Sequence, residues 1–176
     1  MANTTEPIRD LSKVNEMRTA LGNERDRMLF TLGINSGLRI SDLVGLTVED
    51  VKPEMELYEQ KTGKFKRFTL SKSVYNILCE YASKCKHWLF PSRSGYGHIT
   101  TVQAWRKIKA ASIKCGLDNI GTHSMRKTFG YHAYRKGVPI AYLMQVFNHS
   151  SEAITMRYIG ITTEELNTKV YSIMSL

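Results

Sequence analysis

Histidine, arginine and tyrosine residues in the last third of the chain have the types and spacing for chemistry on a phosphate group. His123 and Arg126 are three positions apart, so on a helix they share one face and can reach the same ligand. Arginine keeps its charge and presents a planar fork of donors that matches phosphate oxygens. Tyr158 lies further along, and a tyrosine hydroxyl beside a bound phosphate can become a covalent nucleophile. The tyrosines that compete for this role are Tyr131, Tyr134 and Tyr142.

Three more residues could complete such a site. Arg39 follows Gly37, which is suited to end a helix, so its side chain is expected at a helix junction. Lys61 lies in a Lys-Thr-Gly-Lys turn, where Lys64 is the alternative for any role that needs an ammonium group. His149 can bind a phosphate, or it can cap the helix that follows it. Fixed cations of this kind stabilise the charge that spreads over phosphate oxygens during phosphoryl transfer.

The elements that must position these residues follow from hydrophobic periodicity and turn residues. The pattern predicts one domain that is mainly α-helical with a small antiparallel β-sheet, an α+β fold. Helices are expected over residues 11–21, 23–36, 41–46, 71–84, 102–115, 123–136, 139–147, 151–158 and 163–174. Strands are expected over residues 55–59 and 65–70, with the 61–64 turn between them. Residues 1–9 are expected to be a flexible leader and residues 10–176 the domain itself.

The net charge of +9 is concentrated in one part of the sequence. Between Gln60 and Leu117 the only acidic residue is Glu80, whereas lysine and arginine are frequent. This predicts an electropositive face, and nucleic acid is the favoured partner because basic side chains neutralise phosphates and release counterions. Charge alone leaves open RNA, an anionic membrane or a solvated surface without a partner. The candidate DNA-binding residues are Lys64, Lys66, Arg67, Arg106 and Lys107.

Other classes of protein are disfavoured by what the sequence lacks. No apolar run approaches the roughly 20 residues of a membrane span, and the first residues lack a signal-peptide pattern, so we expect a cytoplasmic protein without membrane contact. Cys79, Cys85 and Cys115 are odd in number, and Cys85 with His87 has no second pair to complete a zinc site. There is also no tight Asp/Glu cluster for magnesium. We therefore expect reduced thiols, no metal and no cofactor.

One known family shares this arrangement in the same order. The ordered set is Arg39, Lys61, His123-x-x-Arg126, His149 and Tyr158. This set resembles the tyrosine recombinase (phage integrase) family, and the likeness spans roughly Arg9 to Ile161. The resemblance implies the integrase catalytic-domain fold. It also implies a site-specific enzyme that cleaves and rejoins DNA through a 3′-phosphotyrosine, without metal or ATP, for a phage or other mobile element.

The resemblance also assigns roles to individual residues. It implies that Tyr158 is the nucleophile and that Arg39 and Arg126 grip the scissile phosphate. It implies that Lys61 is the general acid that protonates the leaving 5′ oxygen, and that His123 is a proton-transfer group. The family pattern thus covers both bond formation and departure of the leaving group.

Two further positions match the family with small departures. The resemblance makes His149 a phosphate ligand and Asp42 a supporting residue, where many members carry Glu. The family usually has Leu-Gly before the second histidine, whereas this chain has Phe147-Asn148. The Gly indicates a left-handed backbone, and Asn is the best substitute there, so we expect the change to be tolerated.

The resemblance extends to assembly and context. Most members carry an N-terminal DNA-binding domain, which we expect to be absent here, either because the chain is part of a longer integrase or because it is a free-standing short member. The implied partner is double-stranded DNA in the bacterial cytoplasm or nucleoid. The implied assembly on this DNA is a homo-tetramer that exchanges C-terminal segments, with DNA-bending proteins as accessory partners. The rival functions are type IB topoisomerase-like relaxation of DNA and non-catalytic DNA-binding regulation.

Overall fold

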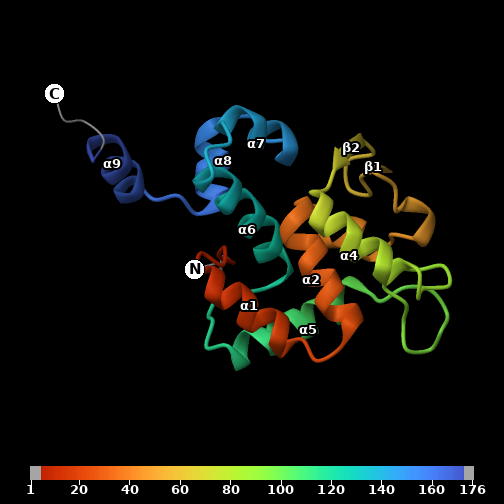
Figure 1. The fold of residues 1–176 in the computed structure, drawn as a ribbon. Coiled ribbons are helices and arrows are strands. Elements are labelled where there is room, and N and C mark those ends of the chain that lie inside the picture. Colours follow the sequence, from red (N-terminus) through yellow and green to blue (C-terminus); the bar gives the residue numbers. More distant parts are fainter. Residues whose placement is uncertain (1–4, 173–176) are drawn as a thin grey trace.

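Helices make up most of residues 5–172, the part of the chain that the computed structural model describes, and one antiparallel hairpin is set among them (Figure 1). The helices are α1 (Leu11–Ala20), α2 (Glu24–Ser36), α3 (Ile40–Val44), the 3₁₀ turn η1 (Val48–Asp50), α4 (Lys72–Ala82), α5 (Thr101–Lys114), α6 (Thr122–Arg135), α7 (Ile140–Phe147), α8 (Glu152–Ile159) and α9 (Thr163–Tyr171). The strands are β1 (Glu54–Tyr58) and β2 (Phe65–Thr69). The predicted fold class, mostly helical with one small antiparallel sheet, is confirmed.

Local sequence explains where several helices begin and end. The Asp10 carboxylate accepts a hydrogen bond from the backbone N–H of Ser12 and caps α1, and Asn23 caps α2 in the same manner. Gly37 ends α2 in the left-handed region with a φ of 61°, as predicted. Asn148 ends α7 with a φ of 58°, which confirms the left-handed backbone expected at this position.

The hairpin pairs β1 with β2, and Tyr58 lies opposite Phe65 at the end nearest the turn. Its turn is closed by two backbone hydrogen bonds, from the Glu59 N–H to the Lys64 carbonyl (2.9 Å) and from the Gly63 N–H to the Glu59 carbonyl (2.8 Å). The expected strands are therefore found, but each ends one residue earlier than predicted, and β1 also begins one residue earlier. The longer turn leaves Glu59 free to point its side chain into the protein.

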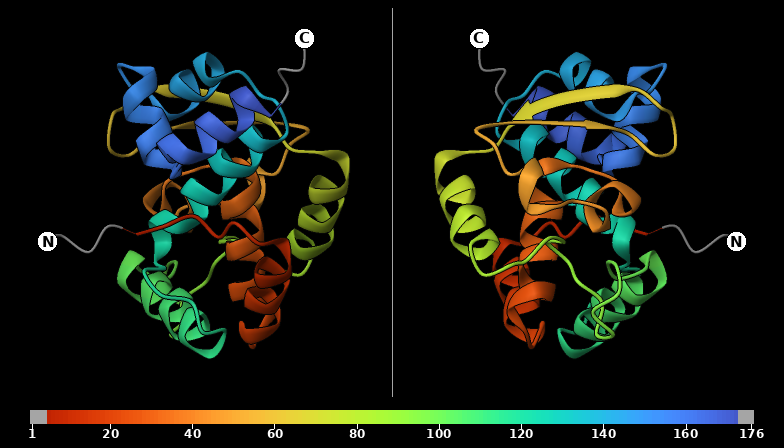
Figure 2. Two further views of the ribbon diagram at one scale, coloured as in Figure 1. Left: turned by 90° about the vertical axis from the view of Figure 1, so that its left-hand side faces the viewer. Right: turned by 90° about the vertical axis from the view of Figure 1, so that its right-hand side faces the viewer.

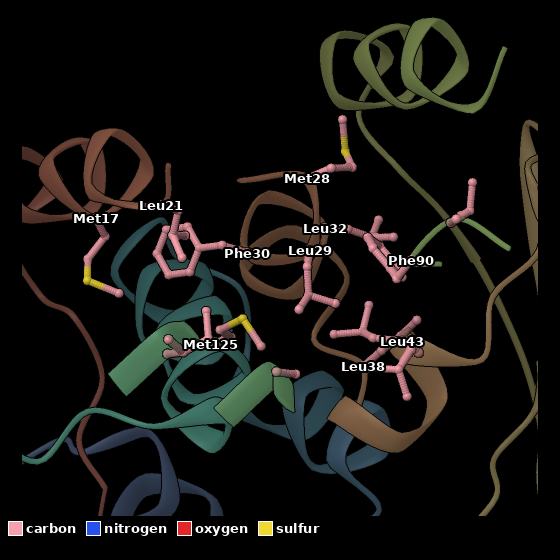
Figure 3. Packing of buried hydrophobic residues seen from close by; sticks show 14 of the residues in the cluster. Met17, Leu21, Met28, Leu29, Phe30, Leu32, Leu38, Leu43, Phe90 and Met125 are labelled. Carbon is pink, nitrogen blue, oxygen red and sulfur yellow. The ribbon is translucent and has the colours of Figure 1, made fainter. Parts of the chain in front are cut away.

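Two clusters of buried apolar residues hold the helices together. The first lies among α1 to α5, where Met17, Leu29 and Phe30 are fully buried (Figure 3). The second lies among α6, α7 and α8 and includes Phe147. Helix α6 joins the two, because Met125 in its first half belongs to the first cluster and its second half to the other. The residues of α6 between these clusters therefore lie at a seam, where a site can be fixed from both sides.

The expectation of a flexible leader is wrong for residues 5–9, while residues 1–4 lie outside the described chain. Ile8 is buried, and its N–H donates to Thr128 Oγ1 at 2.8 Å. The Ile8 carbonyl lies 2.9 Å from His132 Nε2, and the Glu6 N–H donates to the Asn119 carbonyl. This segment packs because Pro-Ile supplies an apolar anchor and α6 supplies polar partners, a pairing that local sequence does not reveal.

Helix α9 stands at the edge of the molecule, away from the hairpin (Figure 1). The sequence predicts an apolar stripe of Leu166, Val170 and Ile173 on the terminal helix, and Leu166 packs partly against the second cluster. The other two stripe positions, the Val170 side chain and Ile173, lie outside what the structure describes. Among the described residues, no helix is long and apolar enough to cross a membrane.

Candidate active site

Most of the polar residues singled out in the sequence come together at the seam on α6. Arg126 occupies the second turn of α6, and the end of α2, the end of α7 and helix α8 surround it. Arg39, His149 and Tyr158 lie near enough to influence the pKa values of one another or of Arg126. The site thus draws on four separate segments of the chain, which explains why its members are scattered in the sequence.

Arg126 is the most deeply buried charged residue of the group, with 4% of its surface exposed. Its guanidinium donates to the Gly37 carbonyl at the end of α2 and, at 3.4 Å, to the Val146 carbonyl in α7. The same group lies over the Phe147 ring, 4.8 Å from its centroid. Burial lowers the pKa of Arg126, while the neighbouring Tyr158 acts in the opposite direction. A guanidinium held in this way is oriented before any ligand binds.

Tyr158 lies in the last turn of α8, near Arg126. Burial raises the pKa of Tyr158, whereas the nearby Arg126 guanidinium acts in the opposite direction. The Tyr158 ring is fixed by Phe147 and His149, with centroids at 5.3 and 4.9 Å. On another side, Lys127 Nζ lies 5.4 Å from the ring centroid. The hydroxyl is thus presented beside a cation on a ring that has little freedom to turn.

The rival tyrosines lie in other surroundings. The Tyr131 side chain is buried, and its hydroxyl donates to Glu165 at 3.3 Å. Tyr142 is largely exposed on α7. Tyr158, by contrast, lies close enough to Arg126 to influence its pKa.

The two histidines occupy different positions around Arg126. His149 Nδ1 lies 3.1 Å from Thr155 Oγ1, and Ser151, not His149, caps α8. Burial lowers the pKa of His149, and Arg126 and Arg39 reinforce the shift. His123 is more exposed, yet partial desolvation of its ring and the nearby Lys127 and arginine charges also lower its pKa. Both rings are therefore expected to be neutral near pH 7, and a neutral imidazole can accept a proton.

Arg39 is held by an acidic residue that sequence inspection missed. Its Nη1 lies 2.6 Å from Glu59 Oε1, and both side chains are largely buried. The Glu59 carboxylate also accepts a hydrogen bond from Thr62 Oγ1 at 2.7 Å. Burial tends to raise the pKa of Glu59, but the ion pair with Arg39 and the other polar contacts outweigh it, so the pKa is lowered. The signal for Glu59 was weak, because a glutamate at the end of an exposed strand is ordinarily solvated.

Asp42 supports the hairpin. Its Oδ1 accepts a hydrogen bond from the Gln60 N–H at 2.9 Å, immediately before Lys61. Asp42 is buried, and its other carboxylate oxygen has no hydrogen-bond partner among the described residues. The side chain thus links helix α3, which begins after Arg39, to the base of the turn.

Lys61 differs from the other expected site residues because it is exposed at the tip of the hairpin. Among residues 5–172 it makes no hydrogen bond or ion pair. Its charge nevertheless contributes to lowering the pKa of His123, so the turn faces the site. The structure therefore places Lys61 near the cluster but does not fix its ammonium group.

The candidate DNA-binding residues of the hairpin have three different environments. Lys64 donates to Asn148 Oδ1. Arg67 lies on the outer face and pairs with Glu56 at 2.6 Å. Lys66 departs from the expected basic surface, because its side chain points inward and donates to the Val146 carbonyl at 3.4 Å. Burial lowers the pKa of Lys66 to about 8, and the charge of Arg126 adds to the shift.

The remaining basic candidates, Arg106 and Lys107, are exposed on α5. With Arg25 and Arg93 they line an open groove of about 720 Å³ between α2, α5 and the loop that precedes α5. Arg25 is already engaged by Asp26 and the Pro91 carbonyl. The other cations of this groove are free to meet an anionic partner, since no acidic side chain lines it.

The cysteines and acidic residues are not grouped as metal ligands in the part of the chain that the structure describes. Cys79, Cys85 and Cys115 are free thiols, as predicted. Within residues 5–172 there is no group of three or more His, Cys, Asp or Glu side chains arranged to hold a metal ion.

Comparison with known proteins places the chain in a family. The phage integrase family model matches residues 8–165. The probable integrase/recombinase YoeC of Bacillus subtilis (strain 168) is 44% identical over 162 residues, which cover 89% of this chain and 90% of that protein. Other curated relatives, named tyrosine recombinases, are matched over about half their length.

Solved structures show the same fold. The XerA recombinase has a TM-score of 0.80 at 18% identity, over 100% of this chain and 66% of that one. The XerH site-specific recombinase bound to palindromic difH substrate has a TM-score of 0.72 at 15% identity, over 98% of this chain and 54% of that one. On the family match and the relatives together, the chain belongs to the phage integrase family of tyrosine recombinases.

Proposed function

We propose that this protein cleaves and rejoins DNA strands at specific sites through a 3′-phosphotyrosine on Tyr158. The observation that carries the proposal is that Tyr158 and the buried Arg126 guanidinium both pack on the Phe147 ring, whose centroid lies 5.3 Å from that of Tyr158 and 4.8 Å from the guanidinium. A phosphate that enters beside Arg126 would meet the tyrosine oxygen directly. Arg39 and His149 add a second cation and a hydrogen-bond donor or acceptor on the same phosphate.

The proposed reaction exchanges one phosphodiester for another. The Tyr158 oxygen attacks the scissile phosphorus, His123 takes the tyrosine proton, and the bond from phosphorus to the 5′ oxygen breaks. Lys61 gives its proton to that leaving oxygen. In the reverse step a 5′ hydroxyl attacks the phosphotyrosine and the two protons return. Arg39 and Arg126 supply the positive charge for the non-bridging oxygens, so the steps require neither a metal nor ATP.

Double-stranded DNA is the proposed substrate. The XerH structure was solved with its difH substrate, and the fold that it shares with this chain supports a similar mode of binding. Arg106 and Lys107 supply exposed positive charge on α5, and Lys64 and Arg67 supply it on the hairpin. We place the activity in the bacterial cytoplasm or nucleoid, in a phage or other mobile element.

A homo-tetramer on DNA that exchanges its C-terminal segments, assisted by accessory DNA-bending proteins, is the proposed assembly. Its support is the position of α9 at the edge of the molecule, where it could dock on a neighbour. Deletion of residues 164–176 should prevent assembly of the tetramer on paired DNA sites in a native gel, while single-site binding persists. Unchanged assembly of the deleted protein would rule out the exchange.

A covalent trap tests the proposed chemistry. The protein and Tyr158→Phe are incubated with nicked suicide duplexes that carry random and element-end sequences, and DNA that stays attached after detergent is sequenced. We expect an adduct that depends on Tyr158 and persists in EDTA. Retained DNA binding without any adduct would instead favour a regulator, and relaxation of supercoiled DNA without strand exchange would favour a topoisomerase-like enzyme.

A further inference from the structure

The hairpin turn that carries Lys61 is a unit with its own internal hydrogen bonds. The Glu59 N–H donates to the Lys64 carbonyl and the Thr62 hydroxyl donates to the Glu59 carboxylate, so residues 59–64 move together. At its base the turn is anchored from the side of α3, because Asp42 accepts from the Gln60 N–H. The base of the turn is therefore fixed, and how far its tip can move depends on the contacts on the side that faces α7.

The other side of the turn is held by the end of α7. Lys64 Nζ donates to Asn148 Oδ1, and two residues later Lys66 Nζ donates to the Val146 carbonyl. The last carbonyls of a helix carry partial negative charge, so this end of α7 attracts both ammonium groups. The hairpin lies beside this end of α7 in the ribbon views (Figures 1 and 2).

The strands pack on the first cluster through Met55 and Phe68, but the side of the hairpin that faces α7 is more open. A cavity of about 360 Å³ lies between the hairpin, α2 and α7, and both Lys64 and Asn148 line it. The polar contacts across this cavity must therefore set how far the turn stands from α7. Asn148 directly precedes His149, so the same contact relates the Lys61 turn to a residue of the phosphate site.

We propose that Lys64 and Asn148 form a clasp that positions the Lys61 turn for proton delivery to the leaving 5′ oxygen. Both are positioning residues that act through Lys61, and the inference rests on the proposed function. Lys61 has no hydrogen bond of its own among the described residues, so the clasp is what limits the positions that its ammonium group can sample. Because the contact is exposed, we expect it to affect the rate of proton transfer to the leaving oxygen more than the free energy of unfolding.

Asn148→Gly is the sharpest variant. Asn148 has a φ of 58°, which glycine adopts without strain, so the change removes the acceptor and keeps the backbone and the net charge. Cleavage of the suicide duplex at saturating protein should slow about 3- to 10-fold, the range for loss of one hydrogen bond to a charged group. Lys64→Met should slow it similarly, and the double variant should be no slower than either, because both remove one contact. Lys52→Ala, an exposed lysine before β1, is the control.

A change of leaving group shows whether the clasp acts through Lys61. A duplex with sulfur in place of the bridging 5′ oxygen releases a thiolate, which needs no general acid. The clasp variants and Lys61→Ala should all cleave this duplex at the wild-type rate, whereas Arg126→Ala should stay slow. The clasp would be overturned if Asn148→Gly cleaved the sulfur duplex slowly, or if it cleaved the ordinary oxygen duplex at the wild-type rate. If the wild-type protein forms no Tyr158-dependent adduct with either duplex, the proposed function fails and the clasp with it.

Discussion

The two halves of the candidate site differ in how firmly they are built. In the half formed by α6, α7 and α8, Arg126 is buried and Tyr158 is flanked by rings and cations. In the half formed by the hairpin, Lys61 is exposed, and polar contacts at the base and the side of the turn restrain it. The difference indicates that the proposed phosphate-binding groups are pre-organised in the free protein, whereas the proposed proton donor is held only approximately.

Phe147 is the centre of the half formed by α6, α7 and α8, which we call the firm half. Its ring lies beside the rings of His149 and Tyr158, with centroids at 5.6 and 5.3 Å, and under the guanidinium of Arg126 at 4.8 Å. Aromatic pairs and cation–π contacts each add to the free energy gained by burial. One apolar side chain therefore orients three of the groups that the proposed reaction uses, and the hairpin has no counterpart to it.

The largest expected effect is that of removing the buried cation. Arg126→Ala should lower the rate of adduct formation about 10²- to 10³-fold, the usual cost of losing a group that stabilises transition-state charge. The rate is measured by single-turnover cleavage of the suicide duplex. Arg135→Ala, in the last turn of the same helix, is the control, because that arginine is exposed. A loss below about tenfold would mean that the firm half does not carry the phosphate.

The packing that fixes the firm half can be broken without touching a polar group. A Cβ at Gly130 would lie 2.6 Å from Ile159 Cγ2 and 2.6 Å from Phe147 Cζ, so Gly130→Ala must push α8 and α7 away from α6. We expect a loss of about 2–3 kcal/mol in the free energy of unfolding, together with slower cleavage. Urea unfolding gives the first quantity. Gly22→Ala is the matched control, since nothing lies within 4 Å of its added Cβ.

The sequence predicted the residues and helices of the firm half more completely than the contacts of the hairpin. The order of arginine, histidine and tyrosine residues identified the group around Arg126, and periodicity found the helices that carry it. These residues are recognisable because their roles restrict their types and their spacing. The left-handed Asn148 was also predictable, because few residues tolerate that backbone.

The features that sequence reasoning missed depend on contacts between distant segments. The pairing of Glu59 with Arg39 and the inward turn of Lys66 follow from how the hairpin docks on α3 and α7. Alternation along β2 puts Lys66 and Arg67 on opposite faces, but it does not say that the basic Lys66 side chain is the one that faces inward. The packing of residues 5–9 on α6 was missed for the same reason.

Lys66 gives the hairpin a measurable pH dependence. Burial lowers its pKa from 10.5 to about 8, so between these values the unfolded chain binds a proton that the folded protein has lost. The free energy of unfolding should therefore rise with pH across this window, and below pH 8 the full cost of the buried charge is present. Lys66→Met should stabilise the protein by about 1–2 kcal/mol at pH 7 and flatten the rise. Urea unfolding from pH 7 to 10 measures both, with the exposed Lys72→Met as control. A rise that survives in Lys66→Met would assign it to another group.

The smallest expected effect comes from exchanging the central ring for the leucine that is usual in the family. Phe147→Leu keeps an apolar side chain of similar volume but removes the ring contacts to His149, Tyr158 and Arg126. We expect a loss of about 1 kcal/mol in the free energy of unfolding and a fall in the cleavage rate of less than about tenfold, because the hydrogen bonds of Arg126 remain. The defect should persist with the sulfur leaving group, unlike that of Asn148→Gly one residue away. If sulfur restored the rate of Phe147→Leu as well, the division between a firm phosphate-binding half and a loosely held proton donor would be wrong, because the ring would then act through Lys61.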